Sequence, residues 1–161
     1  MLAVRDLTAD ETLPAPETAP DHEILGVAPG AVGAVWPHVL PFIERSRAAV
    51  PAMVAARELA EDIRARAERG VYHVWAVYRD QALIGAFVTS LDSYARLRVC
   101  TIQYLAGHDM DAWIDLLDAT VCEWAAINGC AQVELRGRPG WGRKVERLGG
   151  VVTGIACVKG V

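Results

Sequence analysis

Residues 72–89, YHVWAVYRDQALIGAFVT, decide the fold class, because two apolar runs with a period of two flank a short polar turn. Such a pattern predicts two strands, Tyr72–Tyr78 and Ala82–Thr89, joined as a β-hairpin through the Arg-Asp-Gln turn. Working outward, further apolar runs predict strands over residues 97–105, 131–136 and 151–158. The hairpin and these strands are expected to form a single sheet.

Helical spacing of apolar residues surrounds these strands. We expect four helices, over residues 36–50, 52–69, 110–128 and 142–148. In the third helix, Asp109 is a candidate N-cap and Gly129 a candidate C-cap. Trp113 and Trp124 stand about three turns apart, so both are expected on or beside its buried face.

The N-terminal residues have a different composition. Residues 1–24 contain six acidic side chains against Arg5 alone, and three prolines interrupt any period. We therefore expect an extended arm over residues 1–35, followed by one domain over residues 36–161. The arm is expected to run across another protein chain. Its pocket-filling residues would be Leu2, Val4, Leu13, Ile24 and Leu25.

Composition excludes several classes of protein. With 161 residues, 53% apolar residues and a net charge of −4, the chain suits one folded domain and has no overall charge signature for nucleic acid. No apolar run reaches the length of about 18 residues that a membrane span needs, and the N-terminus lacks a basic secretory region. We expect neither secretion nor membrane insertion.

The four cysteines are spaced without a C-x-x-C motif, and the four histidines do not stand at ligand-like spacing. We expect buried free thiols at Cys100, Cys122, Cys130 and Cys157, and no metal site.

Two stretches and the order of elements resemble the GNAT acetyltransferase superfamily. They are WAVYRDQALIGAFVTS, residues 75–90, and EWAAINGCAQVELR, residues 123–136. The resemblance implies an α/β (α+β) fold with a mixed, mostly antiparallel sheet and helices on both faces. Features of this kind specify the fold better than the chemistry.

Three further stretches resemble GNAT-like proteins encoded among the virion structural genes of tailed bacteriophages. They are VWPHVLPFIERS (35–46), IQYLAGHDMDAWIDLLD (102–118) and VELRGRPGWGRKVERLGG (133–150). This resemblance implies a place in a virion or in the host cytoplasm.

The resemblance also implies an acetyl-CoA site, which the residues fit poorly. The family binds the pyrophosphate on a turn of the form Q/R-x-x-G-x-G/A, but here the cofactor-binding candidates are Leu105, Ala106, Gly107 and His108. Only Gly107 matches the pattern. Asp109 and Asp111 follow at once, and their carboxylates repel a bound anion.

The family's general acid is commonly a Tyr in a Y-x-x-x-G-F run on the short helix, where this sequence has Val145. Tyr104 and Glu134 remain as catalytic candidates, although a lone Tyr or Glu on a strand is more often structural. No Ser or Cys nucleophile stands beside a His.

A basic cluster surrounds Trp141, formed by Arg136, Arg138, Arg143 and Lys144. Guanidinium groups and an indole are typical of a protein interface and also suit phosphate binding. Equally, Trp141 could plug the sheet while the basic side chains pair with local carboxylates. Both interpretations stay open at this point.

Two functions follow. The first is a structural or interaction component of a virion or related particle that keeps the fold without acetyl-CoA. Its partners would be other protein chains or further copies of itself, contacted through the arm. The second is an active acetyl-CoA-dependent N-acetyltransferase that acts on an amine of a protein or small molecule. The degenerate turn and the missing Tyr favour the first.

Overall fold

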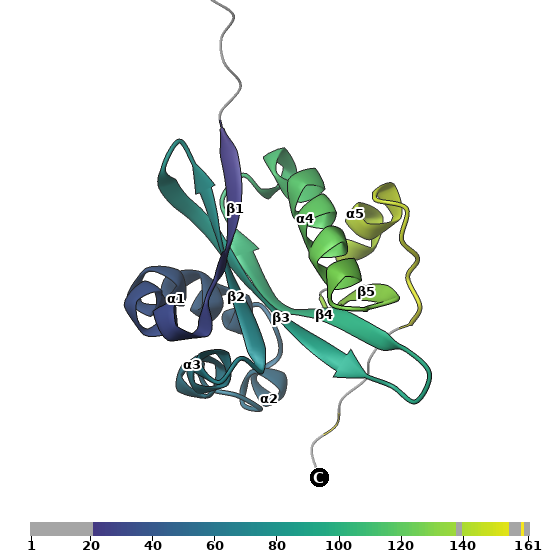
Figure 1. The fold of residues 1–161 in the computed structure, drawn as a ribbon, viewed down its shortest axis with the longest axis horizontal. Helices are drawn as coiled ribbons and strands as arrows, with labels where there is room; N and C mark the ends of the chain where they lie inside the picture. The colour runs from purple at the N-terminus through teal and green to yellow at the C-terminus, as the bar shows by residue number, and fades with distance from the viewer. Residues whose placement is uncertain (1–20, 138–139, 155–158, 160–161) are drawn as a thin grey trace, which may run out of the picture.

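A five-stranded sheet organises the chain in the computed structural model, which describes residues 21–137, 140–154 and 159. The strands are β1 (His22–Val27), β2 (Tyr72–Arg79), β3 (Ala82–Ser93), β4 (Arg98–Gly107) and β5 (Gln132–Leu135). They lie side by side in chain order. Neighbouring strands are antiparallel except β4 and β5, which are parallel (Figure 1). The predicted mixed, mostly antiparallel sheet is confirmed.

The hairpin predicted from residues 72–89 is formed by β2 and β3. Its two turn residues, Asp80 and Gln81, have φ values of +48° and +68°. Left-handed conformations at both central positions are typical of the type I′ turn, whose twist matches that of the paired strands. The sequence predicts the position of this turn correctly. It does not predict the left-handed conformation of Gln81, because glutamine, unlike glycine, does not favour a positive φ.

The boundary of the predicted arm differs from the structure. Residues 22–27 form the edge strand β1 and pair with β2 over its full length, from His22 opposite Arg79 to Val27 opposite Val74. Ile24 packs against the chain's own core, whereas Leu25 is 45% exposed. The paired edge of β2 explains the difference, since it satisfies backbone groups of a segment whose own apolar period is weak. Leu2, Val4 and Leu13 lie outside the described residues, and their docking stays a prediction.

Helices cover both faces of the sheet (Figure 1). On one face α1 (Val32–Ala48) and α3 (Ala60–Glu68) pack against the core, and the short helix α2 (Ala52–Ala55) connects them along the chain. Two pack on the other face: α4 (Ile114–Ile127) and α5 (Trp141–Arg147). Short 3₁₀ turns, η1 (Pro29–Ala31) and η2 (Met110–Ala112), precede α1 and α4. Each face thereby has its own apolar core.

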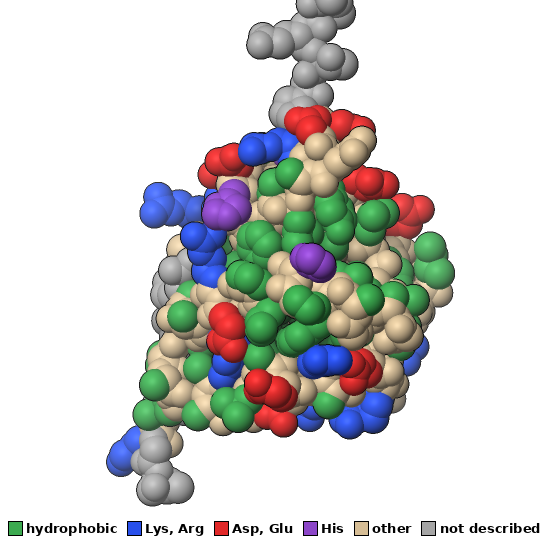
Figure 2. All heavy atoms as spheres, turned by 90° about the vertical axis from the view of Figure 1, so that its left-hand side faces the viewer, with side chains coloured by type: hydrophobic (Ala, Val, Ile, Leu, Met, Phe, Trp, Pro, Cys, Tyr) green, Lys and Arg blue, Asp and Glu red, His purple; other side chains and the backbone are tan. Residues whose placement is uncertain are grey.

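The first helix begins earlier than expected. It starts at Val32 rather than at residue 36, because Val32 is buried and extends the stripe of Trp36 and Val39 by one turn. Both Pro37 and Pro41 therefore lie inside the helix. The helix has no charged residue before Glu44, and Figure 2, which looks onto the α1 side of the molecule, shows apolar side chains gathered in the middle of this face.

The helix expected over 52–69 is broken into α2 and α3. The Arg47 side chain explains the break: its Nε donates to the Glu58 carbonyl (3.0 Å) and its Nη2 to the Ala55 carbonyl (3.1 Å). These carbonyls are thus bound by a side chain of α1. The N–H of Leu59 then donates to the Asp62 carboxylate (2.8 Å), which starts α3.

The C-terminal part differs in two respects. Residues 151–154 have no regular structure, so the strand expected over 151–158 is not formed there, and residues 155–158 lie outside the described part of the chain. Cys122 is exposed on α4 rather than buried, at the open groove between α4, β5 and α5. Cys100 is buried and Cys130 half-buried, both as free thiols, while Cys157 falls outside the described residues.

Among the described residues, no helix has the length and apolar character to cross a membrane. Gly129 ends α4 as expected, with a φ of +73° and its N–H donating to the Ala126 carbonyl.

Candidate functional site

The candidate site lies where β4 continues past the end of the short strand β5. β5 pairs with β4 over its four residues, from Val99 opposite Gln132 to Ile102 opposite Leu135, after which β4 continues to Gly107 paired with β3 on its other side. At the same point β4 carries a bulge. Val88 pairs with Tyr104 and Thr89 with Ile102, so Gln103 has no partner on β3. A bulge bends its strand, so β4 bends just beyond the last residue that pairs with β5.

A side chain from α1 occupies part of the β4 edge that extends beyond β5. The backbone N–H of Leu105 donates to the Ser46 hydroxyl at 3.0 Å. An unpaired strand edge is otherwise a binding place for an extended amide-containing ligand. Ser46 thus satisfies one backbone donor that such a ligand would use.

The turn after β4 is packed around Trp113. This indole is only 1% exposed, and its Nε1–H donates to the His108 carbonyl at 2.8 Å. A Cβ at Gly107 would lie 2.6 Å from the Trp113 ring and 3.1 Å from Gly85. Gly107 therefore meets the needs of local packing: the ring and a facing strand leave no room for a side chain.

Asp109 does not cap the helix as expected. Its φ is +48°, its side chain makes no capping hydrogen bond, and α4 begins only at Ile114 after the 3₁₀ turn η2. Instead, its carboxylate pairs with Arg79 at 2.7 Å. The ion pair draws Asp109 toward the end of β2 and away from the first turn of the helix.

Two more carboxylates beside the turn are paired with α5. Asp111 pairs with Lys144, which holds the pKa of Asp111 below its usual value, and Asp115 pairs with Arg147 at 3.7 Å. Lys144 of the basic cluster therefore forms an ion pair with a carboxylate of its own chain, and so does Arg147, one helical turn later. Arg136 lies 4.0 Å from Glu134, Arg143 is exposed, and Arg138 lies outside the described residues.

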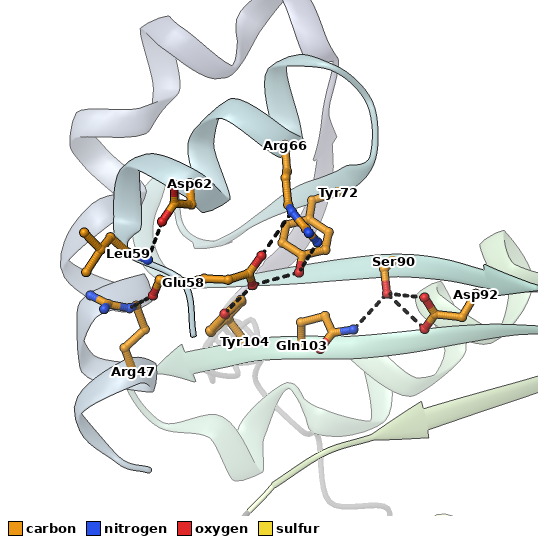
Figure 3. A network of polar contacts seen from close by, with 10 residues as sticks. All are labelled: Arg47, Glu58, Leu59, Asp62, Arg66, Tyr72, Ser90, Asp92, Gln103 and Tyr104. Atoms are coloured by element: carbon orange, nitrogen blue, oxygen red, sulfur yellow. Dashed lines mark hydrogen bonds and ion pairs between the residues drawn. The ribbon is translucent and has the colours of Figure 1, made fainter. Parts of the chain in front are cut away.

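Tyr104 belongs to a hydrogen-bonded cluster on the face covered by α1 and α3 (Figure 3). Its hydroxyl and that of Tyr72 both donate to Oε2 of Glu58, each at 2.8 Å. Arg66 completes the cluster, with its Nε 3.1 Å from the other Glu58 oxygen. Tyr104 therefore holds the α2–α3 segment against the sheet.

Burial and these hydrogen bonds keep both tyrosines protonated. Burial is the larger cause and the bond to Glu58 the next, and together they raise the pKa of Tyr72 to about 12 and that of Tyr104 further in the same direction. A general acid works best with a pKa near the working pH. The pKa of each hydroxyl lies well above neutral pH, so neither tyrosine suits the role of a general acid.

The other sequence-predicted residues are dispersed. Glu134 is half-exposed on β5, and Val145 is half-buried on α5. Trp141 is partly buried against the core beneath α4 and lines an open apolar groove of about 410 Å³ between α4, β5 and α5. Leu105, Ala106, Gly107 and His108 stay together at the end of β4 because they are consecutive.

Sequence reasoning missed Glu58, Ser46 and Arg79. Glu58 stands in a run of alternating charges that is typical of a solvated helix face. Ser46 contacts Leu105, which lies 59 positions later in the chain, and Arg79 contacts Asp109, which lies 30 positions later. No local pattern marks such contacts. Among the described residues, no three His, Cys, Asp or Glu side chains are grouped to hold a metal ion.

Several solved structures share this arrangement of elements. An aminoglycoside acetyltransferase from an uncultured soil metagenomic sample superposes with a TM-score of 0.66 and 12% identity, over 88% of this chain and 99% of that chain. A GCN5-related N-acetyltransferase (GNAT) from Ralstonia eutropha JMP134 gives 0.64 and 14%, over 86% and 99%. The chain has the GNAT fold.

A third GNAT-fold structure, a predicted acetyltransferase with acetyl-CoA from Clostridium acetobutylicum, superposes with a TM-score of 0.64 and 8% identity, over 87% of this chain and 96% of that chain. No protein-family model matches the chain, and no curated protein matches its sequence. At these identities the likeness concerns the fold. The expected GNAT architecture is confirmed, and the resemblance to phage virion proteins stays a prediction.

Proposed function

We propose that this chain is a GNAT-fold protein that has lost acetyl-CoA chemistry. It acts as a structural or interaction component of a virion or a related particle. The observation that carries the proposal is the packing of the turn after β4, where the Trp113 ring fills the space beside Gly107.

The residues at this turn do not fit a diphosphate. An anion is stabilised by free backbone N–H groups and by the positive end of a helix. Here Asp109 and Asp111 carry carboxylates to the same turn, and each already has a cationic partner in Arg79 or Lys144. A diphosphate would have to compete with both carboxylates.

The proton chemistry is also unfavourable. Tyr104, the tyrosine candidate on β4, is held by Glu58 with a raised pKa, and Val145 has no proton to give. Glu134 lies on β5, where that strand pairs with β4, and has Arg136 beside it. These observations support a binding role over acetyl transfer.

The test is a thermal unfolding titration of the full chain with acetyl-CoA, with ATP as the control for unspecific anion effects. A ligand at about 100 times its Kd stabilises a protein by about 2.7 kcal/mol, which raises Tm by several degrees. We expect acetyl-CoA to change Tm no more than ATP does. A larger shift with acetyl-CoA, together with release of free CoA thiol in the presence of amines, would overturn the proposal.

An active N-acetyltransferase is the second candidate. The extension of β4 past the end of β5 favours it, because residues 103–107 keep an edge without a β5 partner, to which an extended ligand can bind. The same titration separates the two candidates, since only the enzyme needs acetyl-CoA.

A further inference from the structure

Residues 1–20 join the described fold at one end of the sheet. The N–H of Asp21 donates to the Asp80 carboxylate (3.1 Å), and the Asp21 carbonyl accepts from the Asp80 N–H (3.0 Å). Asp80 stands in the β2–β3 turn. The chain therefore enters β1 beside this turn, at the top of Figure 1.

The β3–β4 hairpin lies at the opposite end. Its turn is closed by the Tyr94 N–H, which donates to the Leu97 carbonyl at 2.8 Å. Between the two ends runs β3, with 12 residues. At a rise of about 3.3 Å per residue, the two turns are about 40 Å apart.

An exposed concavity of about 520 Å³ lies beside this hairpin, lined mainly by Tyr94, Arg96, Leu97, Gln132 and Glu134, which we call the hairpin surface. Tyr94 is 54% exposed. Arg96 is also exposed, and within the described part of the chain no carboxylate forms an ion pair with it. Glu134, the acidic residue of this surface, has Arg136 beside it at 4.0 Å.

The N-terminal segment is complementary to this surface in charge. Residues 1–20 contain Asp6, Asp10, Glu11 and Glu17 against Arg5. Arginine and tyrosine are the residue types that most often anchor a protein interface, and a guanidinium binds a carboxylate with two parallel hydrogen bonds. An acidic extended segment is thus the chemistry that Tyr94 and Arg96 suit.

We propose that residues 1–20 of one copy bind the hairpin surface of a second copy of this chain. To reach its own hairpin, the segment would need about 12 of its residues to run back along the molecule, and ordering each of them costs conformational entropy. A second copy placed end to end brings its hairpin surface to the segment directly. Such a head-to-tail contact closes into a ring or continues as a filament.

This inference rests on the proposed function, because it names the partner of an interaction component. Its test does not involve acetyl-CoA, so the two can fail separately. Sedimentation of the full chain is expected to show concentration-dependent assembly. The chain without residues 1–20 and the double variant Tyr94→Ala/Arg96→Glu are each expected to stay monomeric, with circular dichroism spectra like that of the full chain.

Mixing the two defective variants is the decisive arm. The truncated chain keeps the hairpin surface and the double variant keeps the segment, so a head-to-tail contact predicts a complex of one copy of each that does not grow. The control variant Arg45→Glu/Arg69→Glu, which reverses two exposed arginines elsewhere, should assemble like the full chain. A labelled peptide of residues 1–20 should bind the truncated chain and lose at least tenfold in affinity for it when Tyr94→Ala/Arg96→Glu is added.

Three results would overturn the inference. A full chain that is monomeric at every concentration would exclude self-assembly. Assembly that survives either defective variant would place the interface elsewhere. A mixture that stays monomeric while the full chain assembles would exclude the head-to-tail contact.

Discussion

The hydroxyl of Tyr104 on β4 donates a 2.8 Å hydrogen bond to Glu58, which lies 46 residues earlier between α2 and α3. The bond joins the sheet to a segment with few other polar ties to it. Because Tyr72 donates to the same carboxylate oxygen, one Glu side chain connects β2, β4 and the start of α3.

Tyr104→Phe should lower the free energy of unfolding by about 1 kcal/mol, the usual net contribution of one hydrogen bond. Glu58 keeps Tyr72 and Arg66, so the fold should survive. Urea denaturation measures the change. Tyr94→Phe is the control, since that ring is exposed at the β3–β4 turn; equal losses for both variants would contradict the structural role of Tyr104.

Alkaline pH should weaken the fold through Tyr72. Burial, followed by the bond to Glu58, raises its pKa in the folded state from 10 to about 12. Its contribution to stability is therefore complete below about pH 10 and is lost as the pH rises through about 12. The free energy of unfolding, measured by denaturation at several pH values across this window, should fall less steeply with pH for Tyr72→Phe than for the natural sequence. Parallel curves would show that Tyr72 is not the group responsible.

Gly107→Ala should destabilise the fold by about 1–3 kcal/mol, as overpacking does. The new Cβ would lie 2.6 Å from the Trp113 ring and 3.1 Å from Gly85, so the ring or the strand must move. From the sequence alone, the expected loss is about 1 kcal/mol or less unless the φ angle of Gly107 is positive. Gly30→Ala is the matched control, because nothing lies within 4 Å of its Cβ position. Equal midpoints in urea would exclude the close packing at Gly107.

Trp113→Ala should cost about 3–5 kcal/mol, the range for a fully buried aromatic residue. Trp124→Ala should cost less, contrary to the full cost that its spacing predicts. Trp124 is only half-buried, with its ring against His73 (4.7 Å between centroids) and Trp75 (5.2 Å). Thermal melts of the two variants decide the order, and a larger loss for Trp124→Ala would contradict the packing.

Most of the fold can be predicted from the spacing of apolar residues and from the residue types at the turns. The alternation in β2 and β3 and the glycine at the end of α4 are local signals, and both lead to the observed elements. Strand β1 is not predicted from the sequence, because an edge strand needs only backbone partners, which β2 supplies. The break between α2 and α3 is not predicted either, because its cause, Arg47, lies on a different helix.

The candidate site is less accessible to sequence reasoning for the same reason. The poor match of Gly107–Asp111 to a phosphate-binding turn can be read from consecutive residues. The partners of Asp109, Asp111 and Tyr104 cannot, since each lies at least 30 residues away along the chain. Long-range pairing of this kind depends on the fold that brings the elements together.

The grip of Arg47 on the carbonyls of Ala55 and Glu58 has a kinetic consequence. A four-residue helix such as α2 would by itself open and close rapidly. Bound to α1 by one guanidinium and to the sheet by Glu58, it cannot open without releasing both. The amide protons of residues 54–59 should therefore exchange with solvent as one cooperative unit, and Arg47→Ala should speed their exchange while the amides of β3 keep their protection.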